Sequence, residues 1–226
     1  MILLDFFFGF VALLMCYQLY CFFRYRGSDY LYFLFFILSV ALFIGIIAGT
    51  GSDLVPLLQQ ATPRYALGFG VLLIGSAMYY RFIRFFCDAD HHYPVFNRIC
   101  KWVEWIQLCA GVLLIVEVVI NKKPVIMKTA AQGVYILTTL FQVYMAIFLV
   151  STRKHYKIFL AIGGIIMGVI IKWVLVPVAL TDQNINELRI FTYLLLGVLV
   201  NFCFIVIAFY LRSRKKGFDM TRSPFN

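Results

Sequence analysis

Long apolar runs, separated by short polar breaks, occupy almost all of this 226-residue chain. A run of about 20 apolar residues spans a bilayer as a helix, because only a backbone that satisfies its own hydrogen bonds persists in hydrocarbon. Hydrophobic residues make up 63% of the chain, and its mean hydropathy is +0.92, more than a soluble domain of this length can bury. The predicted spans are Leu3–Phe23, Tyr30–Gly49, Tyr65–Tyr80, Trp102–Ile120, Thr129–Val150, Ile158–Ala179 and Ile190–Leu211.

The sequence therefore predicts an all-α, polytopic membrane protein whose residues 1–211 form one bundle of seven transmembrane helices. The breaks between the spans are too short to hold a soluble domain. Residues 212–226 are expected to form a short basic cytoplasmic tail. No basic segment precedes the first span, which is typical of a retained anchor rather than a signal peptide.

Positive charge falls mainly in alternate breaks, which predicts the orientation of the chain. Basic residues are retained in the cytoplasm, so the N-terminus is expected outside and the C-terminus inside, with the chain in the plasma membrane. The net charge of +10 is then explained by the basic residues that flank the spans of a protein in a lipid bilayer, and no nucleic-acid partner is expected. The fourteen residues of the cytoplasmic set are Arg24, Arg26, Arg81, Arg84, Arg98, Lys101, Arg153, Lys154, Lys157, Arg212, Arg214, Lys215, Lys216 and Arg222, and the five of the outer set are Arg64, Lys122, Lys123, Lys128 and Arg189.

Small residues at spacings of three and four predict the seams between helices. The hydrophobic effect does not drive helices together within lipid, and small residues let two helices approach closely enough to pack. Packing within one chain explains most of these stripes, and the two GxxxG pairs, Gly45–Gly49 and Gly164–Gly168, leave a homodimer open. The stripes are Ala41, Gly45 and Gly49; Gly68, Gly75 and Tyr79; Ala161, Gly164, Gly168 and Lys172; and Tyr193, Gly197 and Asn201.

The fifth span carries a polar stripe formed by Gln132, Tyr135, Thr139, Gln142 and Ala146, which share one helix face. Two glutamine side chains facing lipid would be costly, so this face is expected to meet protein or a hydrated cavity. Hydrogen bonding between helices and the wall of a ligand or water pocket both fit the pattern.

Two charged residues lie within predicted spans. Lys172 continues the Ala161–Gly168 stripe, and Glu117 lies near the outer end of the fourth span. These two spans run in the same direction, so the two groups reach similar depths, and we predict a Lys172–Glu117 pair, direct or through water or an anion. A structural ion pair, a lysine that extends to the interface and a ligand site are the alternatives. The candidate ligand-binding residues are Lys172, Glu117, Gln132, Gln142 and Asn201.

The second cytoplasmic break contains Cys87, Asp88, Asp90, His91 and His92. Their spacing matches no established metal motif, so a solvated loop is expected and no metal is assigned. No motif of a catalytic nucleophile, metalloprotease or nucleotide-binding loop is present, and the chain is expected not to be an enzyme and to need no cofactor. The following Trp102 and Trp105 fit an aromatic belt at the membrane interface.

Several stretches together resemble the membrane module of bacterial seven-transmembrane receptors with diverse intracellular signalling (DISM) modules. In that family the module usually links an outer carbohydrate-binding-like domain to an inner kinase, cyclase or transcription factor, and this chain contains neither. The resemblance covers nearly the whole chain and implies a membrane receptor. It is carried by Asp29–Phe33, Tyr80–Phe86, Arg153–Lys157, Leu196–Gly197 and the basic exit at Arg212.

The expected function is a receptor or sensor module that passes an outer or intramembrane signal to a protein effector or membrane partner. The signal would leave through the seventh helix, with Arg212, Arg214, Lys215 and Lys216 as the partner-binding residues. A non-catalytic subunit of a larger complex and a small-solute transporter or channel are the alternatives. A transporter is typically built from paired halves or broken helices, and neither is visible here.

Overall fold

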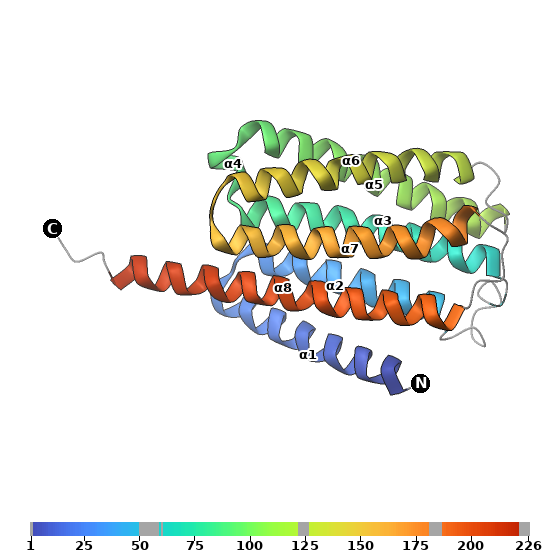
Figure 1. Cartoon of the computed structure of the whole chain (residues 1–226), viewed down its shortest axis with the longest axis horizontal. Helices are drawn as coiled ribbons and strands as arrows, with labels where there is room; N and C mark the ends of the chain where they lie inside the picture. The colour runs from blue at the N-terminus through green and yellow to red at the C-terminus, as the bar shows by residue number, and fades with distance from the viewer. Residues whose placement is uncertain (1, 50–58, 60, 122–126, 181–186, 222–226) are drawn as a thin grey trace. The chain divides into compact units, whose positions relative to one another are not determined.

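The computed structural model of the chain describes residues 2–49, 59, 61–121, 127–180 and 187–221. Its described secondary structure is helical throughout, and each of the seven predicted spans falls on one long helix (Figure 1). The helices are α1 (Ile2–Tyr25), α2 (Ser28–Ile47), α3 (Ala61–Phe86), α4 (Ala89–His92), α5 (Pro94–Asn121), α6 (Met127–Ser151), α7 (His155–Leu180) and α8 (Glu187–Thr221).

Five helices in the described part of the chain are long and apolar enough to cross a membrane: α1, α2, α3, α5 and α8. The described apolar parts of α6 and α7 are shorter and comprise Ile136–Ser151 and His155–Ile166. The prediction of a multi-pass helical membrane protein is therefore confirmed. Five of the seven predicted spans coincide with helices that are long and apolar enough to cross a membrane.

Short turns follow α1, α3 and α6, and each contains a residue with a left-handed backbone conformation. A two-residue turn, Arg26 and Gly27, joins α1 to α2, and Arg26 has a φ of 50°. Asp88 after α3 and Arg153 after α6 take the same left-handed conformation, both with a φ of 53°. Such short turns fix each pair of flanking helices as antiparallel neighbours. Within residues 1–138, the turns after α1 and after α3 lie at the same end (Figure 1).

The C-terminal end of α2 is formed by hydrogen bonds of its last turn and by a glycine. The N–H groups of Ala48 and Gly49 donate to the carbonyl oxygens of Ile44 and Ile46, and Gly49 has a φ of 71°. A glycine in this conformation is the usual way to end a helix, because it has no Cβ to clash. The predicted second span therefore ends at its glycine.

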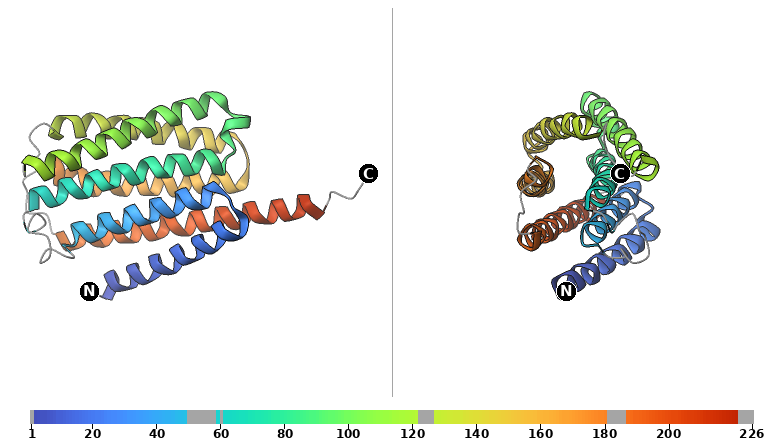
Figure 2. Two further views of the ribbon diagram at one scale, coloured as in Figure 1. Left: turned by 180° about the vertical axis from the view of Figure 1, so that it is seen from behind. Right: turned by 90° about the vertical axis from the view of Figure 1, so that its right-hand side faces the viewer.

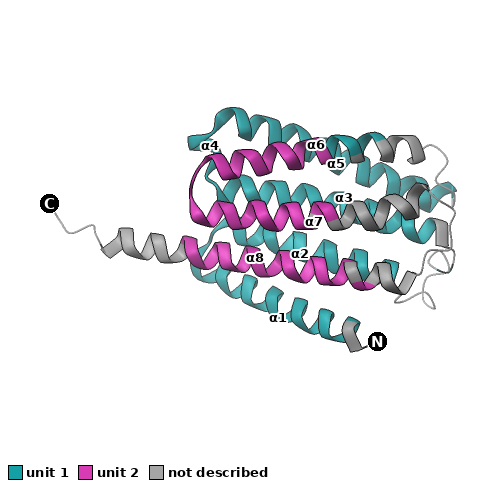
Figure 3. Cartoon of the chain, viewed as in Figure 1, with its two compact units in different colours: residues 1–138 teal, residues 139–226 magenta. Residues whose placement is uncertain are grey.

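Helices α1, α2, α3 and α5 form a row in which each helix packs against the next (Figure 2). The chain divides into two compact units, residues 1–138 and residues 139–226, and this row belongs to the first unit (Figure 3). The boundary falls within α6, so that its first half belongs to the first unit and its second half to the second.

The seam between α2 and α3 contains packed aromatic rings at one end, and at the other end glycines let the two helices approach closely. The rings of Phe33 and Phe82 lie 5.1 Å apart, and those of Phe36 and Tyr79 lie 4.9 Å apart. A Cβ built on Gly75 would lie 2.7 Å from the Cβ of Ser39. Gly68 likewise faces α2, so the predicted Gly68–Gly75–Tyr79 face is confirmed as a helix seam.

The second unit contains a close seam between α7 and α8. A Cβ built on Gly163 would lie 2.7 Å from Oδ1 of Asn201 and 3.1 Å from the Cβ of Phe204. One on Gly168 would instead lie 2.5 Å from Oε1 of Gln142 on α6. Gly168 of the predicted stripe therefore faces α6, and α8 is met by Gly163, which the predicted stripe did not include.

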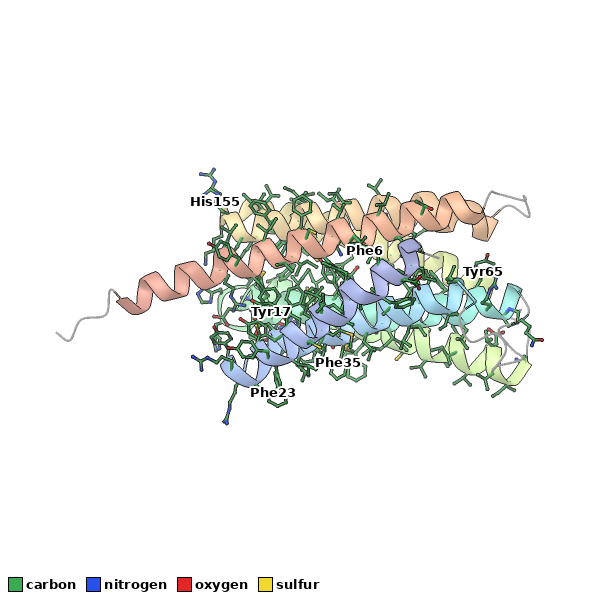
Figure 4. All side chains as sticks on the ribbon, turned by 90° about the horizontal axis from the view of Figure 1, so that it is seen from below. Phe6, Tyr17, Phe23, Phe35, Tyr65 and His155 are labelled. Atoms are coloured by element: carbon green, nitrogen blue, oxygen red, sulfur yellow. The ribbon has the colours of Figure 1, made fainter. Side chains whose placement is uncertain are left out.

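The outward faces of the helices carry large apolar side chains, as expected for helices surrounded by lipid. Phe23 on α1 and Phe35 on α2 project away from the helices (Figure 4). On α5, Leu113 and Ile120 are exposed on the face opposite the buried one.

Candidate functional site: a charged cluster between α3 and α5

The buried face of α5 is polar over its first half. Asn97, Glu104, Gln107 and Gly111 recur with heptad-like spacing together with Cys100, and all five are buried. Residues at this spacing share one face of a helix, and here that face is turned toward protein. In this half of α5, polar groups occupy the positions where a soluble helix would bury leucine.

Glu104 lies at the centre of this face and is only 1% exposed. Its Oε1 pairs with Nη2 of Arg81, and its Oε2 lies 3.3 Å from Nη1 of Arg84. Both arginines come from the last two turns of α3, three residues apart, so that both reach one carboxylate on the neighbouring helix. Two guanidinium groups share one carboxylate, and the cluster holds one positive charge in excess.

The two arginines differ in their surroundings. The side chain of Arg84 is 7% exposed, whereas that of Arg81 is 28% exposed. The guanidinium of Arg81 lies 5.2 Å from the centre of the Tyr32 ring on α2, which in turn stacks on Phe85 at 5.1 Å. A cation over an aromatic face gains electrostatic attraction. Arg81 therefore joins three helices, α2, α3 and α5.

A second polar group lies at the start of α5. Asp90 of α4 accepts a hydrogen bond from Nδ2 of Asn97 at 2.5 Å and lies 3.7 Å from Nζ of Lys101. His92 and Asp88 lie 3.6 Å apart and are both exposed. These contacts fix the short helix α4 to α5 on the solvent side of the cluster. The solvated loop predicted here thus contains a helical turn, because Asp90 is held by the next helix.

Further along the same face, Gln107 reaches α6. Its Nε2 donates to Oγ1 of Thr138 at 2.9 Å, and that hydroxyl donates to the carbonyl oxygen of Val134 at 2.7 Å. Both residues are in the first unit. Amide and hydroxyl groups that meet between membrane helices typically contribute about 0.6–2 kcal/mol.

Burying the charges of this cluster costs free energy, which indicates a role beyond stability. Removing ions from water costs several kcal/mol for each one, and a buried pair recovers it only with good geometry. The buried Nε of Arg84 and Oε1 of Gln107 make no hydrogen bond within the described residues. A hydrophobic set of the same volume would stabilise the seam at least as well, so stability alone does not account for these charges.

The predicted ligand-binding residues are distributed over both compact units. Glu117 is half-buried on α5 in the first unit, while Gln142 and Asn201 lie against α7 in the second. The side chains of Lys172 and Gln132 lie outside the described residues. The Lys172–Glu117 pair therefore stays a prediction, and the contacts of Asn201 and Gln142 described here are with glycines of a neighbouring helix.

The predicted partner-binding residues lie at the end of α8. The helix continues through Thr221, beyond the apolar span Leu194–Arg212, so the stretch predicted to be a tail is partly helical. Arg212 is half-buried. The side chains of Arg214, Lys215 and Lys216 lie outside the described residues, and their role stays a prediction.

Sequence reasoning missed the charged cluster. It assigned Arg81 and Arg84 to a cytoplasmic break, because the third span was ended at Tyr80, and it passed over Glu104. The signal was present in the spacing of Asn97, Glu104 and Gln107, which place polar groups on one face just as the apolar run begins.

No group of three or more histidine, cysteine, aspartate or glutamate side chains that could hold a metal ion is found among the residues that the structure describes. The buried ionic chemistry described here is that of carboxylate and guanidinium groups. Guanidinium groups of this kind are suited by their chemistry to bind oxyanions such as carboxylate and phosphate.

Comparison with known proteins agrees with this architecture. Neither a curated protein nor a solved structure matches the chain. A family model described as 7TM diverse intracellular signalling matches residues 1–212. The match includes the charged cluster and confirms the resemblance that the sequence motifs indicated. The chain is a multi-pass membrane protein and belongs to the 7TM diverse intracellular signalling family.

Proposed function

We propose that the chain is a seven-helix receptor module that converts a signal at its outer or intramembrane side into a change sensed by a cytoplasmic or membrane partner. Membership of a membrane signalling family supports a sensor over other roles. In this proposal the chain itself is non-catalytic, and the response is produced by the effector that it contacts.

The proposed orientation places the N-terminus outside and the basic turns in the cytoplasm of a bacterial inner membrane. Arginine or lysine lies in the turns after α1 and α6, and around the break after α3 it lies in the adjoining ends of α3 and α5, which favours the cytoplasmic side. The three-residue turn between α6 and α7 supports a hairpin of two further crossings, which would bring the total to seven.

The observation that carries the proposal is the sharing of Glu104 by Arg81 and Arg84. A receptor needs an element with two discrete arrangements whose balance a ligand can shift. One carboxylate with two candidate partners, three residues apart on the facing helix, supplies such an element: a small slide of α3 along α5 would favour one arginine over the other.

We place the signal input in the outer half of the bundle, at Lys172, Glu117 and Gln132. The output is proposed to pass through α8, which extends several residues beyond its apolar span. The partner would bind the basic segment at Arg212, Arg214, Lys215 and Lys216.

The test is affinity purification of the full chain in mild detergent, with copurifying proteins identified by mass spectrometry. The variant in which Arg212, Arg214, Lys215 and Lys216 are all glutamine is expected to lose a signalling protein that the wild type retains. The control replaces Arg24, in the last turn of α1, and Arg26, in the turn that follows, with glutamine, and this variant should keep that partner.

Two results would contradict the proposal. If the tail variant retains every partner of the wild type, the basic segment of α8 is not the effector site. If no signalling protein copurifies and the chain moves a solute across proteoliposomes, it is a transporter. An enriched membrane protein with no signalling activity would indicate a scaffold subunit instead.

A further inference from the structure

The charged cluster has a net positive charge, and an unpaired charge costs free energy within a membrane protein. Arg81 and Arg84 carry two positive charges and Glu104 carries one negative charge. In the described part of the chain, ion pairs join these two arginines to this carboxylate alone. The excess charge lies within helices that cross the membrane, where it is poorly screened and favours a counter-anion.

The acidic residue of α2 lies at the beginning of that helix. Asp29 is buried at the first turn of α2, one turn before Tyr32. A Cβ built on Gly27 would meet Oδ1 of Asp29, so this carboxylate folds back against the beginning of its own helix. A carboxylate in the first turn of a helix is favoured by the helix dipole, which gives Asp29 a local reason for this position.

The exposed flank of the cluster belongs to Arg81. Its side chain is 28% exposed, while Glu104 and Arg84 are covered. One face of its guanidinium is covered by the ring of Tyr32, and one nitrogen points to Glu104. The planar guanidinium has five donors in a fork that matches an oxyanion such as phosphate, and this geometry leaves several of them for another partner.

The depth of the cluster matches the phospholipid headgroups. Glu104 lies between Trp102 and Trp105 in the sequence of α5, and these two side chains are 68% and 60% exposed. Exposed tryptophan is typical of the boundary between hydrocarbon and headgroup. Arg98, one turn earlier, is exposed on the same helix. The exposed part of Arg81 is therefore at the level where lipid phosphates lie.

From this geometry we propose that Arg81 binds the phosphate of an anionic phospholipid, with Arg84 and Glu104 holding its guanidinium in place. The lipid supplies the negative charge that the three side chains lack. This proposal stands apart from the receptor function: it requires the cluster to lie at the membrane interface, and it does not require the chain to signal.

The test uses the purified full chain in detergent, and the probes are phosphatidylglycerol, phosphatidylcholine and inorganic phosphate. Native mass spectrometry gives the affinity for the first bound lipid. The wild type is expected to prefer phosphatidylglycerol to phosphatidylcholine, and Arg81→Gln is expected to weaken that first site about tenfold or more, because a charged hydrogen bond is lost. The matched control Arg98→Gln removes an exposed charge at the same end and should weaken it about fivefold at most.

A second measurement keeps the proposal testable if Arg81→Gln does not fold. A phosphatidylglycerol with a photoreactive headgroup should label the wild-type chain on the peptide that contains Arg81 or on the one that contains Trp105. Equal affinities of the wild type and Arg81→Gln would overturn the proposal. Labelling confined to other parts of the chain would also overturn it, as would protection of the site by millimolar inorganic phosphate irrespective of lipid, which would indicate a soluble anion.

Discussion

Gly70 of α3 and Gly111 of α5 meet backbone to backbone. A Cβ built on Gly111 would lie 2.8 Å from the carbonyl oxygen of Gly70, and one on Gly70 would lie 3.1 Å from that of Gly111. No side chain fits between them. This contact fixes the distance between the two helices that hold the charged cluster, so the arginines of α3 can reach Glu104 only while the crossing stays closed.

The glycine contact predicts that Gly111→Ala destabilises the chain. The new methyl group would meet backbone rather than a flexible side chain, and overpacking of this kind costs roughly 1–3 kcal/mol. The measurement is the Tm in detergent. Gly9→Ala on α1 is the control, because nothing lies within 4 Å of a Cβ at that position, and an unchanged or slightly higher Tm is expected there. Equal effects of the two substitutions would show that the α3–α5 crossing is not close.

The cluster predicts a large cost for Glu104→Gln. This change leaves the buried guanidinium of Arg84 and the partly exposed one of Arg81 without their carboxylate, and breaking a buried pair typically costs roughly 3–5 kcal/mol. Unfolding in a denaturing detergent would measure it. Lys101→Gln breaks a pair whose side chains are about half exposed, for which at most about 1 kcal/mol is expected. A loss for Glu104→Gln no larger than that of Lys101→Gln would mean that the cluster is hydrated.

The seam between α7 and α8 predicts compensation between two substitutions. Gly163→Ala places a methyl group against Oδ1 of Asn201 and should destabilise the second unit. Asn201→Ala removes that oxygen, so the double variant should be more stable than the sum of the single effects indicates. Thermal unfolding of all four proteins measures this coupling. Strict additivity would show that Gly163 does not face Asn201.

Hydropathy and small-residue spacing predicted the helices and one of their seams. The positions of the spans follow from the long apolar runs, and the face formed by Gly68, Gly75 and Tyr79 does pack on α2. The spans and the seam can both be predicted from the spacing of residues within one helix, which a single sequence contains. The ends of the helices were less predictable, because the last turns of α3 carry arginines that look like a solvated loop until a partner carboxylate is known.

The charged cluster shows what one sequence hides. Whether an arginine near a helix end faces water or another helix depends on rotation of that helix and on the residue opposite it. Arg84 and Glu104 are twenty positions apart, and neither is unusual by itself. Their meeting depends on how α3 packs on α5, where the Gly70–Gly111 contact keeps the two helices close, and no periodicity within a single helix reveals it.

The topology is most directly tested by thiol labelling in intact cells. In a chain whose six native cysteines have been replaced, Lys123→Cys and Arg214→Cys are introduced one at a time and treated with an impermeant reagent. Seven crossings with the basic turns inside predict that Lys123→Cys reacts at once and that Arg214→Cys reacts only after the membrane is permeabilised. Reaction of both residues from the same side would contradict the orientation and, with it, the proposed path from the outer half of the bundle to the end of α8.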